Sequence, residues 1–340
     1  MKQKGFFDEE DCLEKLSKLG DPLEKLNEFI QWEQFRVILT KALKKEAQGP
    51  GGRPPFDYVM MFKILILQKL YNMADDKTEY QINDRLSFRR FLMLKMHDTV
   101  PDAKTIWNFR EELKTANILD KIFVMFNTQL EKEKIITYSG SIVDATFVEA
   151  PCQRNTKEEN KEIKEGKIPE EWNKEKNKHM KAQKDIDASW VTKNKKRHYG
   201  YKDHIKIDKK SKIITKYRVT TAAVHDSQEL KNLIDKKKDK KLYGDSAFTG
   251  KEIQRCIPKN IKNRIHEKGY RNRPLTKTQI RNNKIKSKIR ARVEHVFAAM
   301  NHFGGKTLRT IGIARAELQI GLLNLTYNLT RYVYLMETRA

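Results

Sequence analysis

Cysteine is scarce in this sequence. Only three cysteines, Cys12, Cys152 and Cys256, occur in 340 residues, and no two of them form a C-x-x-C pair. Their number and spacing favour neither a disulfide framework nor a cysteine zinc site. We therefore expect a protein of the reducing cytosol.

Long hydrophobic runs are also missing. A membrane-spanning helix needs roughly 18 or more apolar residues in succession, and the longest candidate, residues 58–73, is interrupted by Lys63, Gln68 and Lys69. The N-terminal residues become acidic within a few positions and contain no apolar stretch of a secretory signal. The sequence therefore predicts a soluble, cytoplasmic protein.

Acidic residues are outnumbered by basic ones. The chain has 70 Lys and Arg against 45 Asp and Glu, a formal net charge of +25. Such an excess favours a polyanionic partner, because Lys and Arg that neutralise phosphates release condensed counterions. Nucleic acid is the leading candidate. An anionic membrane would require a basic amphipathic helix with an aromatic apolar face, and none is convincing here.

The first 135 residues predict a helical domain. Apolar residues recur there at spacings of three and four, and residues 82–116 have the outline of a helix-turn-helix. Asp102 after Pro101 is the expected N-cap of its second helix. The polar residues expected on the outer face of that helix, as candidates for DNA contact, are Lys104, Thr105, Asn108 and Arg110. Bundle packing or dimerisation is an equally good interpretation of this hairpin.

Beyond this domain the pattern changes to strands, and the first strand carries one acid. Residues 141–148 read S-I-V-D-A-T-F-V, an apolar run of strand length around Asp144. An acid inside a buried strand is costly unless it is paired or holds a metal. Taken alone, Asp144 could equally be a structural acid that forms a salt bridge or caps a helix.

Two further acids follow in related settings. Asp245 comes after the short apolar run K-L-Y-G, and Glu294 lies on a helix expected from about residue 276 to 301. Two strands and a helix can bring three carboxylates to one end of a sheet, where their oxygens suit Mg²⁺ or Mn²⁺. Two such ions can activate an attacking oxygen and stabilise a leaving one in phosphoryl transfer. This argument alone does not select these acids from the 45 present.

Three other segments affect the expected site. Residues 149–196 are rich in Lys, Glu and Asn, which predicts an exposed, flexible insertion. The strand that follows alternates so that Lys202 and His204 lie on a basic face suited to phosphate. His225 precedes the expected helix cap Asp226, and we interpret it as a polar contact of that cap.

Selection of the three acids comes from a resemblance. Its motifs in the C-terminal half are S-I-V-D-A-T-F-V, H-Y-G-Y-K-D-H, T-T-A-A-V-H-D-S, L-Y-G-D-S-A-F and R-A-R-V-E-H-V-F. In the N-terminal half they are F-F-D-E-E-D-C-L-E-K-L-S-K-L-G-D-P-L, G-R-P-P-F-D and V-P-D-A-K-T-I-W-N-F-R. Together they resemble the DDE transposases of the IS5 family of bacterial insertion sequences, within the broader IS4/IS5-like group.

The resemblance implies an α/β (or α+β) fold. A catalytic domain over residues 136–340, with an RNase H-like core and a mixed sheet, would follow the all-α N-terminal domain. The acids that the resemblance assigns to catalysis and to binding two Mg²⁺ or Mn²⁺ ions are Asp144, Asp245 and Glu294. Related transposases frame the glutamate with a Tyr, an Arg and a Lys. Arg290 fits the Arg position, Ser287 and Asn301 stand at the other two, and Arg292 is a candidate substitute for DNA contact.

The implied partner is double-stranded DNA, both the inverted-repeat ends of the element and the target. A homodimer or higher assembly on DNA, associated with the bacterial nucleoid, is expected. The implied reaction is metal-dependent end cleavage followed by strand transfer. Two alternatives stay open: a catalytically silent DNA-binding descendant of a transposase, and a metal-dependent nuclease without strand transfer.

Overall fold

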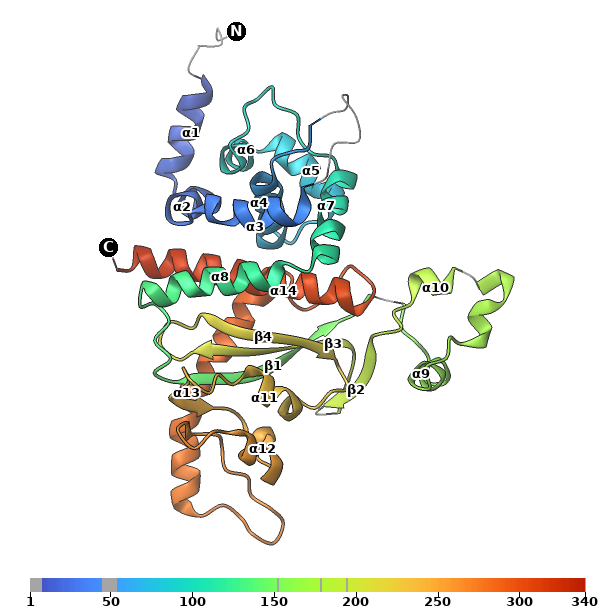
Figure 1. Ribbon diagram of the computed structural model, residues 1–340, viewed down its shortest axis with the longest axis vertical. Helices are drawn as coiled ribbons and strands as arrows, with labels where there is room; N and C mark the ends of the chain where they lie inside the picture. Colours follow the sequence, from blue (N-terminus) through green and yellow to red (C-terminus); the bar gives the residue numbers. More distant parts are fainter. Residues whose placement is uncertain (1–7, 45–53, 152, 178, 194, 340) are drawn as a thin grey trace. The chain divides into compact units, whose positions relative to one another are not determined.

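The chain forms two compact units. The computed structural model describes residues 8–44, 54–151, 153–177, 179–193 and 195–339. The first unit comprises Met1–Phe123 and Leu325–Ala340, and the second comprises Val124–Asn324. The boundary therefore falls within helix α8 (Leu119–Lys132) rather than at residue 135, and helix α14 (Ile313–Glu337) is divided between the units (Figure 1). Among the described residues, no helix combines the length and the apolar character needed to cross a membrane.

The described elements of the first unit are all helical. They are α1 (Asp8–Lys18), α2 (Pro22–Phe29), η1 (Trp32–Phe35), α3 (Arg36–Leu43), α4 (Tyr58–Leu70), α5 (Asp75–Asp84), α6 (Leu86–Leu92) and α7 (Ala103–Ala116). Helix α4 is the centre of this unit, because nine of its 13 residues are buried. Even Lys63 is buried there, with its ammonium 4.6 Å from the ring centroid of Phe91, and burial lowers its pKa to about 8.

The expected helix-turn-helix differs from the observed hairpin. Arg85 has an extended backbone, so it ends α5 and precedes α6. The connection from α6 to α7 spans residues 93–102, which is longer than the three- to four-residue turn typical of the motif. Asp102 does cap α7 as predicted, since its carboxylate accepts the Thr105 N–H at 2.7 Å.

The second unit is built on one mixed sheet with the strand order β2-β3-β1-β5-β6, in which β4 also pairs with β3. The strands are β1 (Ser141–Glu149), β2 (Ser189–Lys193), β3 (Lys196–Asp208), β4 (Ile214–Thr221), β5 (Lys241–Tyr243) and β6 (Lys262–Asn263). The helices, besides parts of α8 and α14, are α9 (Lys157–Lys164), η2 (Glu170–Asn173), η3 (Glu175–Asn177), α10 (Met180–Gln183), η4 (Asp226–Glu229), α11 (Leu230–Leu233), η5 (Ser246–Phe248), α12 (Lys251–Cys256) and α13 (Lys277–His302). Strand β1 runs antiparallel to β3 and parallel to β5, so the predicted mixed sheet is confirmed.

Both faces of the sheet are covered. Side chains alternate along a strand, and Val143 and Val148 of β1 accordingly enter two different buried clusters. The first cluster contains Leu230 and Leu233 of α11. The second contains Ile320 of α14. Helices therefore pack against both faces of β1 (Figure 1), and the strand is partly exposed from Asp144 to Phe147.

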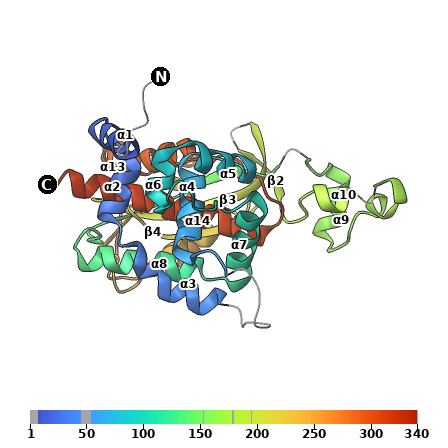
Figure 2. The same cartoon turned by 90° about the horizontal axis from the view of Figure 1, so that it is seen from above.

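Residues 149–196 differ from the expected flexible insertion, because they form short helices around a small core. Trp172 is fully buried, and its Nε1 donates to Glu159 at 2.7 Å. Lys184 also donates to Glu159 at 2.6 Å, and its ammonium lies 5.5 Å from the ring centroid of Trp172. One aromatic side chain and one buried ion pair thus replace the apolar surface that the composition lacks. Helices α9 and α10 extend away from the sheet in both views (Figures 1 and 2).

One buried acid in the sheet lacks a cation. Asp203 of β3 is fully buried, its Oδ1 accepts the Asn324 amide at 3.2 Å, and its Oδ2 has no hydrogen-bond partner within the described chain. Burial raises the pKa of Asp203 to about 8. The folded protein therefore holds a proton here that the unfolded chain releases at much lower pH.

We predict that this proton makes stability fall as pH rises from about 4 to about 8, by up to about 1.4 kcal/mol per pH unit from this group. Asp203→Asn keeps the amide contact without a titrating proton, so its free energy of unfolding should lose that slope. Urea denaturation at several pH values measures the difference. Asp76→Asn, at an exposed position, is the control that should keep the wild-type slope. A slope unchanged in Asp203→Asn would contradict the prediction.

Candidate active site

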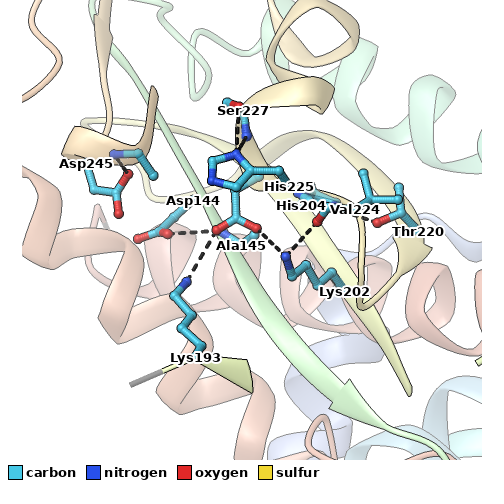
Figure 3. Close-up of polar contacts among 12 residues, drawn as sticks. Asp144, Ala145, Lys193, Lys202, His204, Thr220, Val224, His225, Ser227 and Asp245 are labelled. Atoms are coloured by element: carbon cyan, nitrogen blue, oxygen red, sulfur yellow. Dashed lines mark hydrogen bonds and ion pairs between the residues drawn. The ribbon is translucent and has the colours of Figure 1, made fainter. Parts of the chain in front are cut away.

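Two aspartates meet because β1 and β5 are parallel neighbours. Ile142 of β1 pairs with Tyr243 of β5. Asp144 and Asp245 each follow this pair by two residues, so both lie toward the same end of the sheet. Asp245 is held by capping η5, where its Oδ1 accepts the Ala247 N–H at 2.8 Å. Figure 3 shows the two carboxylates side by side at the end of β5 and in β1.

The third predicted acid comes from α13. This helix begins, as expected, after Thr276, whose hydroxyl and the Gln279 side chain form a capping box. Val293 and Val296 are fully buried, and α13 contacts both β1 and β5. Glu294 lies between these two buried valines in sequence, and 63% of its side chain is exposed.

Arg290 brings the three acids together. Its Nη1 lies 3.4 Å from Asp144 Oδ2 and 4.0 Å from Asp245 Oδ2, and its Nη2 lies 3.3 Å from Glu294 Oε1. Arg290 precedes Glu294 by one helical turn, so the two share a face of α13. The three acids selected in the sequence therefore surround one guanidinium. The sequence predicted Arg290 as a DNA contact and did not reveal this role.

Asp144 is the most desolvated of the three acids. Burial raises its pKa to about 6, while the charge of Arg290 and the Ala145 N–H oppose this rise. The nearby charge of Asp245 adds to it. A carboxylate in this setting gains from any cation that approaches it.

The donor chemistry of the two aspartates fits a divalent cation. Their Oδ2 atoms both face the same nitrogen of Arg290, and carboxylate oxygens are preferred ligands of Mg²⁺ and Mn²⁺. Glu294 contacts the other guanidinium nitrogen instead. Within the described residues, no group of three or more His, Cys, Asp or Glu side chains is arranged to hold a metal ion. Asp144 and Asp245 are therefore the better-placed pair.

The predicted DNA contacts on β3 are wrong. Lys202 and His204 are buried, with exposures of 5% and 1%. Lys202 forms an ion pair with Asp226 at 2.8 Å. His204 shares a hydrogen bond of 2.8 Å with Thr220, and burial lowers its pKa to about 4. The basic face of the strand is covered by the segment that contains η4, so these side chains hold the sheet together.

Three polar residues near the aspartates, His225, Asp226 and Lys193, were only partly predicted from the sequence. His225 is the N-cap of η4, and its Nδ1 lies 2.7 Å from Ser227 Oγ, which confirms its interpretation as a cap contact. Asp226, expected to be the cap itself, is instead buried and also accepts an ion pair from Lys193 at 3.3 Å. In Figure 3, Lys193 extends from β2 toward Asp144. No local pattern marked Lys193, because its partners are remote in sequence.

The remaining DNA-contact candidates have different exposures. Arg110 of α7 is 7% exposed and forms two hydrogen bonds of 2.7 Å to Asp75, so its predicted DNA contact is wrong. Lys104 and Asn108 are exposed on the same helix, and Thr105 is half-buried. For these three the predicted DNA contact stays a prediction.

Arg292 lies on α13 beyond Arg290. Its Nη1 donates to the Lys209 carbonyl at 2.5 Å. The side chain therefore ties the helix to the loop after β3. To contact DNA, Arg292 would have to give up this hydrogen bond. Its predicted DNA contact stays a prediction.

We predict that Arg290→Gln destabilises the protein in metal-free buffer by about 1–3 kcal/mol, because three carboxylates lose their shared cation. Added Mg²⁺ should then raise the melting temperature of the variant more than that of the wild type, since a ligand stabilises the folded state it binds. Thermal denaturation with and without Mg²⁺ measures this. Arg281→Gln, at an exposed position of the same helix, is the matched control. An equal response to Mg²⁺ in Arg290→Gln and wild type would contradict the assignment of Arg290.

Two family profiles match this chain. A family profile described as "Transposase DDE domain" matches residues 136–329, more than half of the chain. A second profile, "Transposase domain (DUF772)", matches residues 11–112. A solved structure of a piggyBac transposase synaptic complex with hairpin DNA is 13% identical, with a TM-score of 0.45, and the similarity covers 94% of this chain and 76% of that one. The chain belongs to the family of transposases with a DDE domain.

Proposed function

We propose that this protein is the transposase of an insertion sequence, of the IS5 type, which cuts the ends of its element and joins them to target DNA. One observation carries the proposal: Asp144, Asp245 and Glu294 all lie within 4.0 Å of the Arg290 guanidinium. Acids of two strands and a helix converge on one cation, and the DDE-domain match covers all three. An RNase H-like core, with a dimer acting on two DNA ends, follows from the same resemblance.

The chemistry proposed for the ends is phosphodiester hydrolysis. The oxygen of water adds to phosphorus, and the bond from phosphorus to the 3′-oxygen breaks, which leaves a 3′-hydroxyl and a 5′-phosphate. Two Mg²⁺ or Mn²⁺ ions, held by Asp144 and Asp245 with Glu294, would supply activation of the attacking oxygen and stabilisation of the leaving one. The freed 3′-hydroxyl then attacks a phosphodiester of the target, where the bond from phosphorus to the target 3′-oxygen breaks and leaves a 3′-hydroxyl on the target strand. No covalent protein–DNA intermediate is needed.

The protein's own cations hold the phosphate at this site. Arg290 contacts the carboxylates through planar N–H donors of the kind that also bind phosphate in pairs. Lys193 reaches the same region from β2 and is held by Asp226. We propose that both side chains contact the strand that is cut, because each is a partly exposed cation near Asp144.

A basic arm of the second unit supports DNA as the substrate. Residues 268–293 contain ten Lys or Arg and no Asp or Glu. The chain before α13 folds back along that helix, where Lys286 donates to the Ile265 carbonyl at 2.9 Å and Asn283 donates to that of Glu267 at 2.9 Å. Glu267, the nearest preceding acid, is paired with Lys286 at 3.2 Å. The arm therefore presents an almost purely positive surface, which favours a phosphate backbone.

We predict that Asp144→Asn abolishes Mg²⁺-dependent cleavage of element ends, by a factor of at least about 10³. Its binding to the same DNA should stay within about twofold of wild type, because the arm and the N-terminal helices are unchanged. Gel assays of end cleavage and a titration of end binding measure both quantities. Asp11→Asn, at an exposed position of α1, is the control. Cleavage by Asp144→Asn at the wild-type rate would exclude the three acids as the catalytic group.

We predict that the wild-type protein joins a pre-cleaved end to a target plasmid. The 3′-hydroxyl of that end replaces water as the attacking oxygen, so the same site serves both steps. Joined products, resolved by electrophoresis and sequencing, support the transposase. Nicking without joining would indicate a nuclease instead, and binding alone would indicate a catalytically silent DNA-binding protein.

A further inference from the structure

A pocket lies at the base of the insertion, between α9 and the hairpin of β2 and β3. Its volume is about 500 Å³, within the range of sites that hold a small molecule, roughly 300–1,000 Å³. Of the described residues that line it, none is acidic and four are cationic: Lys157, Lys161, Lys164 and Arg197. The pocket is therefore suited to an anion.

Three lysines and Glu159 lie on opposite sides of α9. Lys157, Lys161 and Lys164 recur at spacings of four and three, which places them on one side of the helix, toward the pocket. Glu159 lies on the opposite side and binds Trp172 and Lys184 inside the insertion. Glu159 is thus directed away from the pocket, and no acid of the helix is among the described residues that line it.

The pocket also has a buried polar wall. Asn155 is 2% exposed, and its amide donates to the Asp185 carbonyl at 2.8 Å. Its Oδ1 is buried without a hydrogen-bond partner among the described residues. An orphan carbonyl oxygen of this kind is costly unless water or a ligand donates to it. The Asn155 backbone carbonyl is fixed separately, because it accepts Trp190 Nε1 at 2.9 Å.

Strand β2 connects this pocket to the aspartates. Thr192 lines the pocket, and the next residue, Lys193, forms the ion pair with Asp226. Burial raises the pKa of Asp144, and the charge of Lys193 is among the groups that oppose this rise. Figure 3 shows Lys193 directed toward Asp144. Strand β2 therefore carries a residue of the pocket and, on its other face, a cation of the region around Asp144.

We propose that this pocket binds an unpaired nucleotide of a DNA strand next to the bond that is cut. The lysines of α9 and Arg197 hold its phosphates, and Asn155 Oδ1 accepts a hydrogen bond from an N–H of its base. That the nucleotide belongs to the DNA strand that is cut rests on the proposed function. The anion-binding pocket itself depends only on the groups that line it.

The test uses the full chain carrying Asp144→Asn, so that binding is measured without cleavage. The pocket variant adds Lys161→Gln and Lys164→Gln. The control adds Lys167→Gln and Lys176→Gln, which remove the same charge from the same insertion outside the pocket. A single-stranded oligonucleotide of about ten nucleotides and a duplex of equal length are titrated at several salt concentrations. Equal melting temperatures check folding, and Arg197→Gln supplies an independent pocket variant from another strand.

The pocket variant should bind the single strand about tenfold more weakly than the control. Its salt slope should fall by about 1.4, the contribution of two phosphates on a single strand, while affinity for the duplex stays equal. Equal single-strand affinities in the pocket and control variants would overturn the inference, even if the wild type transposes. Loss confined to the pocket variant supports it, even if the wild type fails to cut ends. Binding of free thymidine monophosphate to the control but not to the pocket variant, with equal oligonucleotide affinities in the two, would indicate a mononucleotide site and overturn it.

Discussion

The structure of the second unit depends on an acid inside a central strand. Asp144 lies in β1, which pairs with β3 on one side and with β5 on the other. Burial raises its pKa to about 6 against the opposing charge of Arg290, so the folded state tolerates the carboxylate only with a cation beside it. That cation comes from α13, and the same guanidinium contacts Asp245 and Glu294. This contact adds to the apolar packing of α13 against the sheet and gathers three acids around one cation.

The polar face of β3 also buries charged side chains that need a partner, but there the buried groups are cations and their partners are acids. Lys202 and Lys206 are buried at 5% and 1% exposure, and their ammonium groups are paired with Asp226 at 2.8 Å and Asp239 at 2.9 Å. Both acids lie in the chain between β4 and β5, around α11. The sheet and its covering segment are therefore joined by internal ion pairs as well as by the apolar cluster around Val143. Removing one partner of either pair would leave a buried charge.

These ion pairs explain what the sequence could and could not reveal. Helix starts at Asp102 and Thr276 were predictable, because a cap and the N–H it accepts are neighbours in sequence. An acid in β1 and another after β5 were also predictable, since an acid beside an apolar run is a local signal, but their selection from the other acids came from the resemblance. The burial of Lys202 was not, because an alternating strand looks the same whether solvent or another segment covers its polar face. Nor was the core of the insertion, where Trp172 and the pair of Glu159 with Lys184 replace the missing aliphatic residues.

One glycine allows a close approach between two strands where the insertion begins. Gly200 of β3 pairs with Glu149 at the end of β1, where the insertion begins. Its φ of +145° is rarely adopted by other residues, and a Cβ there would lie 2.3 Å from the Val148 carbonyl oxygen. Only glycine therefore lets β3 approach the end of β1 so closely. On the N-terminal side of Gly200, β3 pairs with β2. Strand β2 carries Lys193, which is directed toward the aspartates (Figure 3). This close backbone approach depends on the pairing of two strands that are remote in sequence, which a single glycine in the sequence does not reveal.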